Sequence, residues 1–311
     1  MKLVASRDGY GSALVKLATD PEVIVVEADL GKSTKSQNFR KLHPERTISL
    51  GIAEQNMMLV SAGLATSGYK PFASTFAIFT ERAFEQVRNG IARPNIPVHI
   101  CGSHGGIHTG TDGSSAQSIE DLAIYRSLPN MLVLHPSDFN STEQLTIQLA
   151  STNSPSYTRT ARNKTPVIYD EHAASKLVIG KGAILSEGED VAIIACGVMV
   201  SRALEAAETL SRNGINATVV DMHTIKPLDG TLISALAEKC GCFVTAEDHS
   251  IIGGLGGAVA EHLVENCPTP LERVGVSDHF GQSGDGDELL EQFSMGTNHI
   301  ISAVQRTIQR K

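Results

Sequence analysis

Short apolar segments alternate with amphipathic segments along this chain, and that alternation restricts its fold more than any other feature. Residues 12–18 repeat apolar side chains with helical spacing, and residues 23–28 then form a β-branched run typical of a strand buried on both faces. Strand-like segments return in the second half at residues 191–195, 217–221 and 242–246. This succession predicts an α/β fold with mostly parallel sheets covered by helices.

The length of 311 residues exceeds that of one average domain, so two domains are expected. A polar and poorly periodic run follows Arg162 and interrupts the strand and helix signals. We therefore predict a first domain over residues 1–165, a linker over residues 166–185 and a second domain over residues 186–311.

The composition argues against several classes of function. The net charge of −8 and the lack of a basic run argue against a surface for nucleic acid or anionic membrane. The five cysteines are scattered, and Cys240 and Cys242 are too close together for a zinc knuckle. Neither a signal peptide nor an apolar run long enough for a membrane span is visible. We expect buried thiols in a reducing, cytoplasmic protein without a metal site of its own.

The stretch from Gly51 to Phe79 combines three features that suit a flat, weakly basic heteroaromatic ring. Glu54 stands where an apolar run turns into a helical pattern, the helix is lined by Gly and Ala, and Phe76 and Phe79 follow it. An acid can hydrogen-bond a ring nitrogen while a phenylalanine packs on the ring face. A structural interpretation stays open, because the helix dipole favours a first-turn Glu and Phe pairs three apart often belong to a core.

Ordered blocks over nearly the whole chain resemble the transketolase family. They are Ala5-Ser-Arg-Asp8, Glu27-Ala-Asp-Leu-Gly-Lys-Ser33, the Gly51 to Phe79 stretch, Gly102-Ser-His-Gly-Gly106, Asp112-Gly113, Arg159-Thr-Ala-Arg162, Thr224-Ile-Lys-Pro-Leu-Asp229 and Glu247-Asp-His249. The resemblance implies the pyrimidine-binding fold followed by the transketolase C-terminal domain. It also implies that the domain binding the diphosphate and metal end of thiamine diphosphate belongs to a separate chain, as in a split transketolase.

The same resemblance assigns the cofactor residues. Glu54 would share a proton with the aminopyrimidine ring of thiamine diphosphate, Phe79 would stack on that ring, and Phe76 and Ile52 would line the pocket. In the family, such a shared proton favours the imino form of the exocyclic amine, so Glu54 would prepare the cofactor's own ring to act as the base.

A basic set matches family positions that contact the substrate phosphate, namely Arg7, Ser33, His104 and Arg162. Two guanidinium groups with a hydroxyl and an imidazole suit the several acceptor oxygens of a phosphate monoester. Any one of them alone would be read as a surface charge or a helix cap.

The glycine-rich loop over residues 102–115 matches the family only in part. Asp112 corresponds to the aspartate that hydrogen-bonds a donor-sugar hydroxyl, although a turn role also suits it. Thr111 stands where many members carry an acid, and Ala116 stands where they carry His or Gln, which puts donor preference or rate in doubt. His108 either reaches into the site and replaces the side chain that Ala116 lacks, or it is a histidine solvated in the loop.

Two glycine motifs are interpreted as structural. Gly284-Asp-Gly286 copies the start of the thiamine diphosphate fingerprint, but it lies too near the chain's end for the partner asparagine. Gly253-Gly-Leu-Gly-Gly257 looks like a phosphate loop, yet it lacks the dinucleotide spacing, so close helix packing explains it better.

The resemblance thus predicts a subunit of a transketolase that moves a two-carbon ketol unit from a ketose phosphate to an aldose. Mg²⁺ or Ca²⁺ would be held by the partner chain, in an α₂β₂ assembly with active sites between subunits. Three alternatives stay open: a specialised ketolase for an unusual ketose phosphate, the β subunit of a 2-oxo acid dehydrogenase, and a non-catalytic regulatory paralogue.

Overall fold

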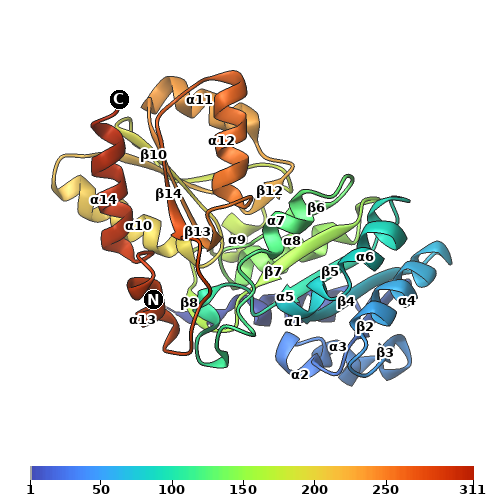
Figure 1. The fold of residues 1–311 in the computed structure, drawn as a ribbon. Coiled ribbons are helices and arrows are strands. Elements are labelled where there is room, and N and C mark those ends of the chain that lie inside the picture. Colours follow the sequence, from blue (N-terminus) through green and yellow to red (C-terminus); the bar gives the residue numbers. More distant parts are fainter. Residues whose placement is uncertain (1) are drawn as a thin grey trace.

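The structure, a computed structural model, describes residues 2–311 and contains two larger sheets, each covered by helices on both faces. Figure 1 shows the N-terminal elements gathered in one lobe and the elements from β9 onward mostly in the other. A two-stranded ribbon of β1 (Leu3–Ala5) and β8 (Lys164–Pro166) joins the chain's start to the end of the first lobe. The α/β fold with mostly parallel sheets is confirmed.

The first sheet has seven strands in the order β12-β6-β7-β5-β4-β2-β3, and all neighbouring pairs are parallel except β12 with β6. Their bounds are β2 (Val23–Glu27), β3 (Thr47–Ser49), β4 (Lys70–Phe76), β5 (His99–Ser103), β6 (Leu132–Leu134), β7 (Ser156–Thr160) and β12 (Thr224–Lys226).

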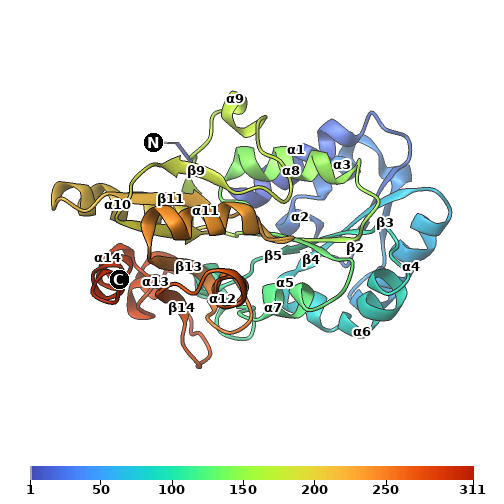
Figure 2. The ribbon, with the colours of Figure 1, turned by 90° about the horizontal axis from the view of Figure 1, so that it is seen from above.

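Alternate residues of β2 explain how both faces of this sheet are covered. Val23 and Val25 pack with α1 (Ser6–Leu17), α3 (Gln37–Leu42) and α8 (Phe139–Leu149). Ile24 and Val26 join the opposite core, which includes residues of α4 (Glu54–Thr66) and α7 (Asp121–Arg126). Figure 2 shows these two helix layers on either side of the strands. A strand buried on both faces requires the unbroken apolar run that the sequence has here.

The second sheet has five strands in the order β14-β13-β10-β11-β9, with only β9 antiparallel to its neighbour. The strands are β9 (Ala183–Ser186), β10 (Val191–Ala195), β11 (Ala217–Asp221), β13 (Phe243–Ser250) and β14 (Leu271–Val276). Its helices are α10 (Met199–Arg212) and α14 (Thr297–Ile308), which share one core, and α11 (Gly230–Cys240) and α12 (Leu255–Asn266), which share the other.

Shorter elements complete the chain: α2 (Gly31–Thr34), η1 (Pro44–Arg46), α5 (Ala77–Glu81), α6 (Phe84–Gln86), η2 (Val87–Ala92), η3 (Ile107–Asp112), α9 (Glu171–Ala174) and α13 (Gly286–Gln292). Within residues 2–311, none of the helices combines the length and apolarity that crossing a membrane would require.

The two lobes share one interior. β12 follows β11 in the chain yet pairs with β6, so a strand from the second half forms the last strand of the first sheet. One apolar cluster also runs continuously from Met57 on α4 to Leu263 on α12. Because burial of apolar surface stabilises both lobes at once, they are expected to unfold together.

Two segments near the site are less regular than their neighbours. The segment Lys70-Pro-Phe72 opens the central strand β4, and Pro71 is tolerated because it lies near the strand's start. The region after β4 does not form one continuous helix but is divided into α5, α6 and the π-helix η2. Helix α5 already begins at Ala77, directly after Phe76 ends β4.

The glycine motifs have structural roles, as interpreted. A Cβ on Gly254 would lie 2.1 Å from Glu247 Oε2, so only glycine allows α12 to start this close to β13. Asp285 is the N-cap of α13, accepting hydrogen bonds from the amides of Asp287 and Glu288.

Candidate functional site

Apart from Arg7, which follows the ribbon strand β1, the predicted site residues lie at or after the carboxyl ends of neighbouring parallel strands. Glu27 at the end of β2 is in register with Ser49 and Ser74, and Phe76 at the end of β4 is in register with Ser103. Ser103 in turn is level with Thr160 of β7. The loops after these strands therefore emerge along one edge of the sheet, which is where open α/β folds bind ligands.

Glu54 is the first residue of α4 and is 3% exposed. Among residues 2–311, no side chain or backbone group donates a hydrogen bond to its carboxylate. Its oxygens are not among the fully enclosed side-chain atoms that lack a partner, so they reach the surface and can meet a donor from outside the chain. Ile52, two residues earlier, is 76% exposed and lies on the surface before the helix.

Phe76 and Phe79 stack in parallel, with ring centroids 5.6 Å apart and an angle of 6° between the planes. His104 stacks on Phe76 at 3.9 Å and 19°. Both phenylalanines remain partly exposed rather than filling a core. Because Phe76 already carries the imidazole, Phe79 is the ring better placed to pack against a ligand.

Arg7, His104 and Arg162 come together although they are far apart in the sequence. Arg7 Nη1 lies 3.4 Å from His104 Nε2, and burial lowers the pKa of Arg7, with positive Arg162 acting in the same direction. Burial, with Arg7 and Arg162 close by, also lowers the pKa of His104 to about 3. The imidazole is therefore neutral at pH 7, and the positive charge of this cluster comes from the two guanidinium groups.

Hydrogen bonding defines the His104 tautomer. A guanidinium can only donate, so Nε2 accepts from Arg7. The ring proton is then on Nδ1, which donates to Ser103 Oγ at 2.8 Å. Nε2 thus presents a lone pair to the cluster in the absence of an anion.

Ser33 joins the cluster through its backbone, since its carbonyl accepts from Arg7 Nη1 at 2.9 Å. The segment that carries Ser33 is held by buried Glu27, which accepts from Ser36 Oγ at 2.9 Å and from Arg40 at 3.1 Å. A Cβ on Gly31 would lie 1.9 Å from Glu27 Oε2. Glycine is therefore required for this close approach.

The glycine-rich loop places Asp112 at the end of η3, where its carboxylate lies 3.5 Å from Arg162 Nη2. Ala116 is half-buried and has no polar side chain to offer. The expectation that His108 is either solvated in the loop or reaching into the site was wrong. His108 is 4% exposed, and its Nε2 lies 3.1 Å from Asp287 of α13, which draws the ring toward the second lobe.

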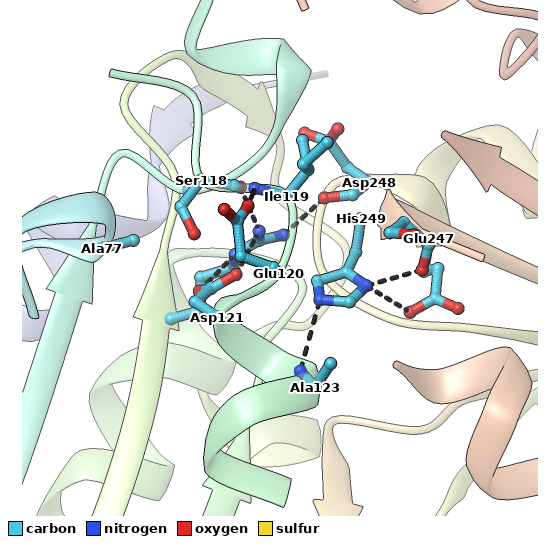
Figure 3. A network of polar contacts seen from close by, with 12 residues as sticks. Ala77, Ser118, Ile119, Glu120, Asp121, Ala123, Glu247, Asp248 and His249 are labelled. Carbon is cyan, nitrogen blue, oxygen red and sulfur yellow. Dashed lines mark hydrogen bonds and ion pairs between the residues drawn. The ribbon is translucent and has the colours of Figure 1, made fainter. Parts of the chain in front are cut away.

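The buried ion pair of Arg159 and Asp121 belongs to a hydrogen-bond network that reaches Asp248 in the second lobe. Figure 3 shows this network, with Ser118, Asp121 and Asp248 labelled. Arg159 and Asp121 are both fully buried, with Arg159 Nη2 2.6 Å from Asp121 Oδ1. Arg159 also donates to the carbonyls of Ser118, at 2.7 Å, and Asp248, at 2.5 Å. Asp248 in turn accepts from the amides of the loop residues 107 and 108. These contacts fix the loop that carries Asp112.

Glu81 on α5 connects the phenylalanine pair with the same loop. Its Oε1 accepts from Ser118 Oγ at 2.5 Å, and burial raises the pKa of Glu81 to about 8. The acid is thus protonated at neutral pH, two residues from Phe79. Sequence reasoning missed Glu81, Asp121 and the role of Arg159, because nothing in their spacing distinguishes a buried acid or base from an exposed one.

Comparison with known proteins identifies the family. Residues 2–167 match the transketolase pyrimidine-binding domain, and residues 180–300 match the transketolase C-terminal domain. The chain belongs to the transketolase family. The predicted resemblance is therefore confirmed, whereas the domain boundaries and the site residues stay predictions.

Curated transketolase relatives differ in length. The chain is 44% identical over 308 residues to a putative transketolase C-terminal section of Methanocaldococcus jannaschii, covering 98% of this chain and 96% of that protein. It is 39% identical over 307 residues to the 6-deoxy-6-sulfo-D-fructose transketolase subunit SqwH of Clostridium sp. (strain MSTE9), covering 98% and 95%. It is 42% identical over 314 residues to mouse transketolase-like protein 2, covering 99% of this chain but 49% of the mouse protein, and so spans about half of that relative.

Solved transketolase structures likewise include one chain that is matched over nearly its full length and another that is matched over less than half of it. A split-gene transketolase, described as an inactive β4 tetramer, superposes with a TM-score of 0.92 at 45% identity, covering 98% of this chain and 99% of that chain. Pichia stipitis transketolase in complex with sedoheptulose-7-phosphate superposes with a TM-score of 0.83 at 26% identity, covering all of this chain but 46% of that chain. This chain thus corresponds to the C-terminal section of a full transketolase.

Proposed function

We propose that this protein is the pyrimidine-binding subunit of a thiamine diphosphate-dependent transketolase and works with a separate diphosphate-binding chain. Two observations carry the proposal: Glu54 is a buried residue whose carboxylate has no donor among residues 2–311, and the phenylalanine pair is stacked but not buried in a core. An aminopyrimidine offers both the nitrogen that such an acid needs and the flat face that Phe79 would cover. The match to a pyrimidine-binding domain supports the same ligand.

When bound, the cofactor supplies a nucleophilic carbon that accepts and releases the two-carbon unit. The protein's part is to hold a proton at the Glu54 carboxylate, to pack Phe79 on the ring, and to exclude water from that contact. Within residues 2–311, no three His, Cys, Asp or Glu side chains gather into a set that would hold a metal ion. We assign the Mg²⁺ or Ca²⁺ that binds the diphosphate to the partner chain.

The substrate proposal rests on the cluster of Arg7, His104 and Arg162. Two half-buried guanidinium groups attract a dianion. An arriving phosphate would also favour protonation of His104, because it cancels the positive charge nearby. His104 Nε2 would then donate rather than accept. We assign to Asp112, which lies 3.5 Å from Arg162 Nη2, the role of accepting a hydrogen bond from a sugar hydroxyl. We therefore propose a ketose phosphate as donor and an aldose as acceptor.

A sulfonated ketose is a second candidate donor. A relative that is similar over 98% of this chain is the subunit of a 6-deoxy-6-sulfo-D-fructose transketolase. A sulfonate has the same three oxygens as a phosphate but one negative charge, so the same cluster would bind it with a weaker attraction. Ala116, in place of the His or Gln of many family members, also indicates a specialised donor.

Reconstitution tests the proposed function. The chain is combined with a diphosphate-binding transketolase chain, thiamine diphosphate and Mg²⁺, and ketol transfer is measured with fructose 6-phosphate and 6-deoxy-6-sulfofructose as donors. We expect activity only when both chains are present. Glu54→Gln should abolish it, whereas Glu208→Gln, an exposed change on α10, should not.

Two outcomes would contradict the proposal. Turnover by the single chain would rule out the shared cofactor site, and near-normal turnover of the Glu54→Gln complex would remove Glu54 from the chemistry. Assembly without any turnover, with Glu54 unaltered, would favour a non-catalytic regulatory paralogue instead. Calorimetric titration of thiamine diphosphate into both complexes separates loss of binding from loss of chemistry.

A further inference from the structure

A cavity of about 480 Å³ lies between the linker segment and strand β9, and it contains none of the residues assigned to the cofactor or the sugar. Its apolar wall includes Ile168, Leu177, Val178, Ile184 and Leu185. Ile184 is 45% exposed on the edge strand of the second sheet, and Val178 is 54% exposed in the linker. The volume falls within the range of small-molecule sites, which are mostly apolar with a few polar groups.

The rim of this linker cavity is basic. Lys176, Lys181 and His172 line it together with a single acid, Asp170. Asp170 is already engaged, since it caps α9 by accepting from the amide of Ala173 at 2.7 Å. Lys181 lies 3.7 Å from Asp229, whereas Lys176 makes no ion pair within residues 2–311. An unpaired lysine beside an apolar wall favours a negatively charged ligand with an apolar body.

His223 gives an independent indication of a ligand. It lines the cavity although the residue is 0% exposed, and its Nδ1 is hydrogen-bonded to Thr224 Oγ1 at 3.0 Å. Its Nε2 is buried and has no hydrogen-bond partner among the described residues. Burial also lowers the pKa of His223 to about 4, so the ring is neutral at pH 7. Buried polar atoms nearly always have a partner, and this nitrogen is suited to one from a bound molecule.

We propose that the linker cavity is a binding site for a small carboxylic acid that carries an apolar body and a hydroxyl or carbonyl group. The carboxylate meets Lys176, the apolar body lies against Leu177 and Ile184, and the hydroxyl or carbonyl reaches His223 Nε2. The site joins the linker to β9 and to the residue before β12, the strand that the second half contributes to the first sheet. A ligand here contacts both lobes without touching the cofactor site.

The test is a titration of the full chain with 2-hydroxy-3-phenylpropanoate, followed by calorimetry. We expect saturable binding at millimolar concentration or below, and binding at least about tenfold weaker for the neutral amide of the same acid. Lys176→Gln should weaken binding of the acid by about the same factor, because it removes the same charge pair. Ile184→Glu should abolish binding by placing an acid on the apolar wall. Lys41→Gln, an exposed change on α3, should leave it unaltered.

The ring nitrogen of His223 supplies a second readout that needs no mutation. In ¹⁵N-histidine-labelled protein, the Nε2 resonance of His223 should shift on addition of 2-hydroxy-3-phenylpropanoate and shift less with 3-phenylpropanoate, which lacks the hydroxyl. Absence of saturable binding, or equal binding to the Ile184→Glu variant, would overturn the proposal. Neither measurement involves thiamine diphosphate or turnover, so failure here is separate from failure of the proposed enzyme activity.

Discussion

Replacing Arg159 by methionine should destabilise the protein more than any change on its surface. The substitution removes a fully buried charge and leaves Asp121 buried with only the Tyr157 hydroxyl, 2.6 Å away, as a donor. Although burial by itself disfavours the charged form, Arg159 holds the pKa of Asp121 below its ordinary value. The carboxylate would therefore face the desolvation cost without its counter-ion.

The magnitude follows from the contacts that are lost. Breaking a buried ion pair by removing one partner costs about 3–5 kcal/mol. The Asp248 carbonyl loses its donor, which adds about 1–3 kcal/mol. The Ser118 carbonyl keeps the amide of Gly106 at 2.7 Å and adds little. The sum of about 4–8 kcal/mol is comparable to the whole stability of many proteins, about 5–15 kcal/mol.

Urea unfolding at a fixed protein concentration measures this loss. The chain has no tryptophan, so far-UV circular dichroism and tyrosine fluorescence are the suitable signals. The matched control is Arg212→Met, which breaks the exposed pair with Glu208 and should cost no more than about 1 kcal/mol. The double variant Arg159→Met with Asp121→Leu should be more stable than Arg159→Met alone, because no unpaired charge is left inside.

Two results would refute this reasoning. A loss of less than about 1 kcal/mol in Arg159→Met would mean that the pair contributes no more than a surface pair. A double variant no more stable than Arg159→Met would mean that loss of packing, rather than the unpaired Asp121 carboxylate, causes the destabilisation.

Three further predictions concern the site and its loop. Glu81→Gln should stabilise the protein relative to wild type by an amount that grows from pH 5 to pH 8, as measured by urea unfolding. The unfolded acid ionises near its ordinary pKa, while the folded acid keeps its proton to about pH 8. The wild type therefore loses stability as the pH rises between these two pKa values. A stability difference that does not vary with pH would contradict this prediction. Arg162→Leu in the reconstituted enzyme should raise KM for a phosphorylated donor about tenfold or more with a smaller effect on kcat, as loss of a charge-assisted hydrogen bond implies, and an unchanged KM would remove Arg162 from anion binding. Gly106→Ala should lower the melting temperature by several degrees, because Gly106 has φ 85° and a Cβ there would lie 2.1 Å from Asp248 Oδ2; a melting temperature equal to that of wild type would show that the loop adjusts freely.

The sequence could predict those strands whose own residues are enough to indicate a buried strand. The apolar run of β2 identifies a doubly buried strand without reference to any neighbour. By contrast, β7 reads Ser-Tyr-Thr-Arg-Thr, and every residue of it is buried. Most of its polar side chains find partners on other elements, as Arg159 does with Asp121, although Thr158 Oγ1 has none among residues 2–311. Burial of such a strand depends on contacts that no local pattern contains.

The candidate site could also be predicted only in part, because some of its properties depend on contacts between segments far apart in the sequence. Family spacing was enough to nominate Arg7, His104 and Arg162, and the structure brings these three together. The spacing did not reveal that His104 is neutral, since its low pKa results from burial and from two guanidinium groups, one on helix α1 and one on the segment after β7. It also missed the surroundings of His108, which was expected either to reach into the site or to be solvated, whereas its Nε2 lies 3.1 Å from a carboxylate of the distant helix α13.

The strand that crosses between the lobes has a consequence for dissecting the protein. A fragment ending before residue 224 would lack β12, and the outer side of β6 would then present unpaired amide and carbonyl groups. An open row of this kind invites pairing with another chain, so the isolated first lobe is expected to aggregate. A fragment meant to fold alone would need residues 224–226 fused to it, because the N-terminal half of the sequence lacks the strand that covers the β6 edge of its sheet.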